Sequence, residues 1–162
     1  MIKVVIVILL AFNILACEPM SLAAKKIKTQ QQTPFTCLSS QSQCEINSEF
    51  GHFNIQFSGQ IEQGRIKTEM PFQVQLKFDA DNEKHQLLKV SSYLEGKTMY
   101  MGKIPVIFKS DAKTENTMVA ETLLASCSQE LMTWRLWFQL EIVAEGEIKQ
   151  QSIFVDFESK RL

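Results

Sequence analysis

The stretch "MTWRLWFQLEIVAEG", Met132 to Gly146, decides the fold class. Apolar and polar side chains alternate along it, and the apolar ones share a single face: Trp134, Leu136, Phe138, Leu140 and Ile142. The opposite face carries Arg135, Gln139 and Glu141. A period of two is typical of a β-strand with one face on a core and the other in water. The stretch therefore predicts a half-buried strand of an antiparallel sheet.

Six other stretches with strand character lie on either side of this one, and polar or glycine-containing breaks separate them. They cover residues 52–59, 71–79, 87–96, 104–110, 117–126 and 148–159. About seven strands of this length, with no convincing amphipathic helix among them, are typical of an antiparallel β-sandwich. We therefore expect an all-β domain with an immunoglobulin-like topology, although the pattern does not give the strand order.

The N-terminus has the pattern of an export signal. A positive start, "MIK", precedes the apolar run Val4–Leu15, which is too short to span a bilayer as a helix. Residues 1–16 are thus predicted to be a signal peptide, with two processing routes open. Cys17 would be the lipidated first residue of a lipoprotein, or an ordinary peptidase would cleave after Ala23. Both routes place the protein outside the cytoplasm, in the periplasm of a Gram-negative cell, and lipidation of Cys17 would anchor it to the membrane.

The remaining chain divides into a tether and one domain. Residues 17–36 are rich in Lys, Gln and Thr and predict a flexible tether, and residues 37–162 predict the sandwich. The whole chain has 162 residues and is 45% hydrophobic, enough for one sizeable core. A net charge of -1 with dispersed Lys and Arg gives no face for nucleic acid.

Three cysteines follow Cys17, so at least one of them has no partner within its own chain. Cys37 and Cys44 enclose the short polar segment "LSSQSQ", which favours a local disulfide because the closing loop is small. That pairing would leave Cys127 as a free thiol. A cross-link from Cys37 or Cys44 to Cys127 remains an open alternative.

Four sulfur atoms form a candidate metal site. Met99 and Met101 flank a tyrosine and would face the same side of an extended chain, while Cys127 and Met132 lie on either side of the short connection "SQEL". Thioethers and a thiolate are the ligands that copper(I) prefers, so the four predict a copper(I) site of two to four ligands at one rim of the sandwich. The alternative is that the methionines only fill the core and that Cys127 is a buried thiol.

Other chemistries find less support in the sequence. A blue-copper site needs two histidines, and no histidine follows Cys127. His52 and His85 are interpreted as surface residues, with His52 a ligand only if its strand meets the sulfur rim. Neither histidine stands in a motif that would activate a nucleophile, so we expect no catalysis.

A second function class follows from the outward face of the opening stretch. Trp137 and Arg135 would form an exposed aromatic and cationic patch there, a composition that is common at protein interfaces. The alternative prediction is thus an immunoglobulin-like interaction module of the cell envelope that binds an envelope protein partner and no metal. Covering of Trp137 by the protein's own chain would argue against it.

The order Met-x-Met-Gly, then "VAETLL", then "MTWRLW" resembles small YtkA-like and FixH-like extracytoplasmic domains over roughly residues 90–143. That resemblance implies a β-sandwich associated with copper handling and respiratory-oxidase assembly. It also implies that Met99 and Met101 lie on the metal side and that Trp134 is a core residue. The chain differs in having Lys97 and Lys103 where that family often has histidines, and Cys127 has no secure counterpart.

Overall fold

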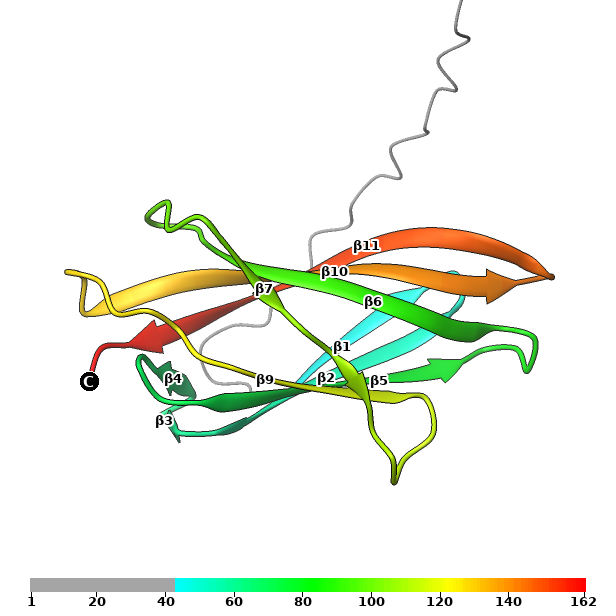
Figure 1. Cartoon of the computed structure of the whole chain (residues 1–162), viewed down its shortest axis with the longest axis horizontal. Coiled ribbons are helices and arrows are strands. Elements are labelled where there is room, and N and C mark those ends of the chain that lie inside the picture. Colours follow the sequence, from blue (N-terminus) through cyan, green and yellow to red (C-terminus); the bar gives the residue numbers. More distant parts are fainter. Residues whose placement is uncertain (1–42) are drawn as a thin grey trace, which may run out of the picture.

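The structure is a computed structural model that describes residues 43–162 (Figure 1). The predicted signal peptide, the tether, Cys17 and Cys37 lie outside these residues. Eleven strands and no helix make up the regular structure of the described part. The strands are β1 (Gln43–Ser48), β2 (Gly51–Gly59), β3 (Ile61–Glu62), β4 (Arg65–Lys67), β5 (Phe72–Ala80), β6 (Gln86–Gly96), β7 (Lys103–Val106), β8 (Lys109–Ser110), β9 (Thr117–Thr122), β10 (Leu131–Ala144) and β11 (Glu147–Lys160).

Two sheets pack as the layers of a sandwich. One has the order β1-β2-β5-β9-β8, and the other has the order β3-β4-β11-β10-β6-β7. Within them, β2-β5-β9-β8 and β11-β10-β6 follow the A-B-E-D and G-F-C orders of the immunoglobulin fold. Figure 1 shows β6, β10 and β11 in one layer and β2, β5 and β9 in the other. The expectation of an all-β, immunoglobulin-like sandwich is confirmed.

The stretch 104–110, expected as a single strand, is divided between the two sheets. Its first part is β7, which pairs with β6, and its last residues are β8, which pairs with β9. Pro105 lies in β7, an edge strand, where the missing N–H costs no ladder bond. The chain changes sheets at Ile107, which is exposed, and Phe108, which is buried.

The short strands β1, β3 and β4 were not expected from the sequence. β1 extends the first sheet beyond β2, and β4 pairs with β11 in the one parallel contact among the described strands. β3 and β4 have only two and three residues, too few for a period of two to be recognised. The additional strands lie at the edges and widen the two sheets.

The core forms where the alternating faces of the two sheets meet. Trp134, Leu136, Phe138, Leu140 and Ile142 of β10 are all at most 1% exposed, as the alternation predicts. The inward residues of β2 and β5 meet them from the other sheet, and the rings of Phe53 and Phe78 stack with centroids 4.8 Å apart. Burial of such aromatic and aliphatic side chains is the dominant favourable contribution to folding. In the described part of the chain, no helix is long and apolar enough to cross a membrane.

Candidate metal centre

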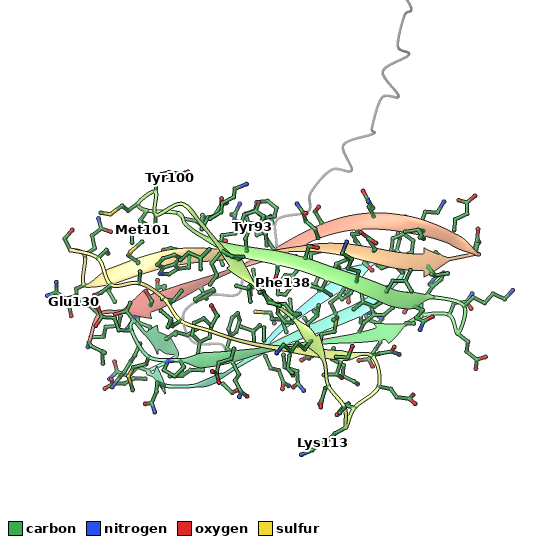
Figure 2. The ribbon with its side chains drawn as sticks, in the orientation of Figure 1. Tyr93, Tyr100, Met101, Lys113, Glu130 and Phe138 are labelled. Atoms are coloured by element: carbon green, nitrogen blue, oxygen red, sulfur yellow. The ribbon has the colours of Figure 1, made fainter. Side chains whose placement is uncertain are left out.

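Met99 and Met101 lie in the loop that joins β6 to β7, not in a strand as the sequence pattern predicted. Both side chains are nevertheless partly buried and pack against the core, while Tyr100 between them is 86% exposed. Figure 2 shows Tyr100 at the outer tip of the loop and Met101 nearer to the start of β10. The loop therefore directs both thioethers inward from one end of the sandwich.

Cys127 and Met132 approach the same end from the connection between β9 and β10. Cys127 carries a free, partly buried thiol, and Met132, the second residue of β10, is 3% exposed. The alternation of β10 places Met132 on the inner face with Trp134. Sγ of Cys127 and Sδ of Met132 are 2.8 Å apart. The two sulfurs are therefore in direct contact.

Gly96, the last residue of β6, lies next to the side chains of Met101 and Met132 and the backbone of Met99. It pairs with Trp134 of β10, so the loop begins beside the first residues of that strand. A Cβ atom at Gly96 would lie 3.1 Å from Cε of Met132, 3.4 Å from Cγ of Met101 and 2.3 Å from the carbonyl oxygen of Met99. Met101 and Met132 thus occupy the space that any other residue at position 96 would fill. We call Met101, Cys127 and Met132 the sulfur cluster; Met99 lies beside it on the same loop.

The sulfur cluster has the donors of a soft-metal site. A thiolate and neutral thioethers suit copper(I), and binding would release the thiol proton. Two sulfurs that share one ion through bonds of about 2.3 Å lie roughly 3.8 to 4.0 Å apart at tetrahedral or trigonal angles. Cys127 and Met132, at 2.8 Å, would separate by roughly 1 Å to admit an ion, a movement that the flexible methionine side chain allows. Among the described residues, no three His, Cys, Asp or Glu side chains form a metal-binding group.

Both histidines lie at the other end of the sandwich. Nδ1 of His52 is 2.6 Å from Oδ1 of Asn47, and its Nε2 is 3.3 Å from Oδ1 of Asp81. His85 lies in the connection between β5 and β6, with Nδ1 3.0 Å from the carbonyl oxygen of Phe50. The strand that carries His52 does not bring it to the sulfur cluster, so the conditional role of His52 as a ligand has no support in the geometry.

Arg135 and Trp137, the predicted docking patch, contact other side chains of the same sheet. Trp137 donates from Nε1 to Oε1 of Glu95 at 2.6 Å, and its ring packs against those of Tyr93 and Phe154. The Arg135 guanidinium lies 3.7 Å from the centre of the Phe154 ring. The two side chains contribute to an ordered cluster on the outer face of β6, β10 and β11, which gives the docking prediction little support.

Asp156 is the centre of that cluster, and sequence reasoning did not identify it. Its carboxylate is 4% exposed and accepts hydrogen bonds from Nε and Nη2 of Arg135, at 2.7 and 2.9 Å, and from Nζ of Lys97 at 2.7 Å. Burial raises the pKa of Asp156, but the hydrogen bonds and charges of Arg135 and Lys97 outweigh it, so the net pKa lies below the ordinary value. The same hydrogen bonds raise the pKa of Arg135. An acidic residue between Val155 and Phe157 in an apolar run was the available signal.

The geometry defines an immunoglobulin-like β-sandwich with a sulfur cluster at one end. No family model matches the chain, and no curated protein matches it, so the YtkA-like and FixH-like resemblance stays a hypothesis. Among solved structures, a DUF4785 family protein from Legionella pneumophila is similar, with a TM-score of 0.54 and 13% identity over 70% of this chain. The alignment covers 29% of that larger protein. At this identity the likeness concerns the fold alone.

A superoxide reductase (neelaredoxin) from Ignicoccus hospitalis also aligns, with a TM-score of 0.42 and 12% identity over 68% of this chain and 80% of that one. A variant of the same reductase aligns with a TM-score of 0.41, 12% identity, and 67% and 79% coverage of the two chains. These scores are too low to transfer a site or an activity.

Proposed function

We propose that this protein is an exported, non-catalytic β-sandwich, anchored through a lipid on Cys17, that binds copper(I) with Met99, Met101, Cys127 and Met132. Its role is to store the ion or deliver it to a partner protein of the cell envelope. The observation that carries the proposal is the convergence of the sulfur cluster. The Cys127 and Met132 sulfurs are in contact at 2.8 Å, and the side chains of Met101 and Met132 both pack against Gly96.

Charge matching supports copper(I) over a divalent ion. The sulfur cluster supplies one ionisable ligand, Cys127, and Met132 is buried among apolar neighbours. A thiolate with a monovalent cation is neutral overall, whereas a divalent ion would leave a net positive charge in a poorly solvated place. The export pattern at the N-terminus agrees with this assignment, because copper(I) handling with sulfur ligands is a recognisable extracytoplasmic function.

The surface beside the sulfur cluster supports delivery. A shallow cavity of about 310 Å³ is lined mainly by Pro71, Ile104, Leu123 and Ala125, with Glu121 and Thr122 at its side. Ile104 is three residues after Met101 and pairs with Leu94, two residues before Gly96, and Ala125 is two residues before Cys127. Leu123 is 53% exposed there. An apolar surface next to the ion would let a partner come close and exclude water during transfer.

An anaerobic copper(I) competition titration tests the proposal on purified protein whose Cys127 thiol has been confirmed by mass. Cys127→Ala and the double variant Met101→Leu/Met132→Leu should each weaken binding on the order of 100-fold, because each removes ligands. Leucine keeps the volume of methionine, which limits the structural cost. Met118→Leu is the matched control, since Met118 packs against the core away from the cluster. Wild-type protein that loses copper(I) to a weak chelator, or variants that bind as wild type does, would refute the proposal.

A further inference from the structure

The loop that carries Met99 and Met101 is fastened at both ends. At its start, Lys97 donates its backbone N–H to the carbonyl oxygen of Thr133 at 2.9 Å, and its Nζ to Oδ2 of Asp156 at 2.7 Å. At its end, Nζ of Lys103 lies over the ring of Tyr93, 4.4 Å from the centroid. The side-chain contacts of both lysines reach the outer face of the sheet, opposite the core that the methionines contact.

The ion pair between Lys97 and Asp156 has the features of a strong contact. Asp156 lies on β11 with 4% of its side chain exposed, and it is already held by the fork of Arg135 from β10. Hydrogen bonds between ionised partners are shorter and stronger than neutral ones, and poor exposure of the acceptor reduces their screening. Lys97 is therefore tied to β10, the neighbour of β6, through its backbone, and to β11, one strand further, through its side chain, which is 40% exposed.

The geometry points to Lys97 and Asp156 as positioning residues of the copper site, a role that rests on the proposed function. Their ion pair fixes the first residue of the loop immediately after Gly96. The five residues that follow it, up to Gly102, then have few conformations available, and Met101 is held over Gly96 beside Met132. Without the pair, binding an ion would have to order the loop first, and that entropy would be lost from the affinity.

Two variants of Lys97 and one control test the inference. Lys97→Leu removes the charge and adds no sulfur, and Asp156 keeps its paired bonds to Arg135, so the fold is retained. Lys97→Arg preserves the charge and should restore the contact. Lys89→Leu is the matched control, because Lys89 of β6 pairs with Glu141 of β10 at 3.3 Å in the same sheet but far from the loop.

Two measurements are made on each protein: amide hydrogen exchange of residues 97–102 without metal, and copper(I) affinity by competition. We expect Lys97→Leu to exchange about fivefold faster in the loop and to bind copper(I) roughly tenfold more weakly. Lys97→Arg should approach wild type, and Lys89→Leu should match it in both measurements.

The outcomes separate this inference from the proposed function. Loop exchange in Lys97→Leu equal to wild type overturns the positioning role, whatever the protein binds. Faster exchange with unchanged copper(I) affinity overturns it as well, because the loop position would then not matter for the site. Wild-type protein that binds no copper(I) refutes the proposed function, while hydrogen exchange still decides whether Lys97 holds the loop.

Discussion

At the scale of single residues, the absence of a side chain at Gly96 is as informative as the sulfurs around it. The methyl end of Met132, the side chain of Met101 and the backbone of Met99 all crowd the position of its missing Cβ. Because core side chains pack at crystal-like density, no room is left there for a side chain on residue 96. The glycine is required because the loop folds back against the strand that it leaves.

Gly96→Ala should therefore displace the loop. The added Cβ would meet the Met99 carbonyl oxygen at 2.3 Å, a backbone contact that no rotamer change relieves. We expect a loss of about 1 to 3 kcal/mol in the free energy of unfolding and faster amide exchange in residues 97–102. Chemical denaturation and hydrogen exchange measure the two effects.

Gly146→Ala provides the control for that experiment. Gly146 lies in the turn between β10 and β11 with φ of 81° and open space around its Cβ position, so alanine there costs about 1 to 2 kcal/mol of backbone strain without a clash. It should lower stability and leave exchange in residues 97–102 unchanged. If Gly96→Ala keeps both the stability and the loop exchange of wild type, the close approach at Gly96 is wrong.

At the scale of elements, β10 shows how one strand serves two environments. Trp134 on its inner face is 0% exposed and donates from Nε1 to Oγ of Ser159 at 3.0 Å. Trp137 on its outer face lies among Tyr93, Phe154 and Arg135 and is partly exposed. Alternation alone predicted which tryptophan faces the core. It did not predict the cluster around the other, because that cluster depends on which strands lie beside β10.

The two tryptophans should therefore differ in what they contribute to stability. Trp134→Phe creates a cavity and leaves the hydroxyl of Ser159, a residue that is 1% exposed, without its donor, so we expect a loss of about 2 to 4 kcal/mol. Trp137→Phe removes a hydrogen bond to Glu95 at a partly exposed site and should cost about 1 kcal/mol. Urea denaturation of both variants gives the comparison. Equal losses would contradict the assignment of β10 to one buried and one open face.

At the scale of the whole molecule, the sequence pattern predicted β2, β5, β6, β9, β10 and β11 and the inward face of β10, since a half-buried sheet requires alternation. The seventh expected strand, 104–110, is divided between β7 and β8. Met99 and Met101 were placed on one side of an extended chain. The structure reaches the same inward direction through a loop, which alternation cannot describe. The contact of Lys97 with Asp156 spans 59 residues and required the pairing of β6, β10 and β11. A single sequence does not contain that order, so the support of the candidate site could not be predicted although its sulfurs could.

Asp156 of β11 is joined to Arg135 of β10 and to Lys97 in the loop after β6, and it should give the protein a specific response to acid. Its folded pKa lies below the ordinary 3.8, despite its burial, because Arg135 and Lys97 favour the carboxylate. A depressed pKa stabilises the fold at pH values above the ordinary one, and that contribution is lost as the pH falls through the folded pKa. Asp156→Asn, which mimics the protonated state, should cost about 2 kcal/mol at pH 7.

The difference in unfolding free energy between wild type and Asp156→Asn should shrink when both are titrated from pH 7 down to pH 3, because the unfolded wild type binds a proton at Asp156 below the ordinary pKa of 3.8, while the depressed pKa makes the folded state resist it. Asp79→Asn is the control, since Asp79 pairs with Lys77 at an exposed site, and an exposed pair contributes little to stability at any pH. Urea denaturation at each pH measures the three proteins. A gap between wild type and Asp156→Asn that stays constant to pH 3 would mean that the carboxylate is not the charge that joins the loop to the sheet, and the positioning of the sulfur cluster would need another cause.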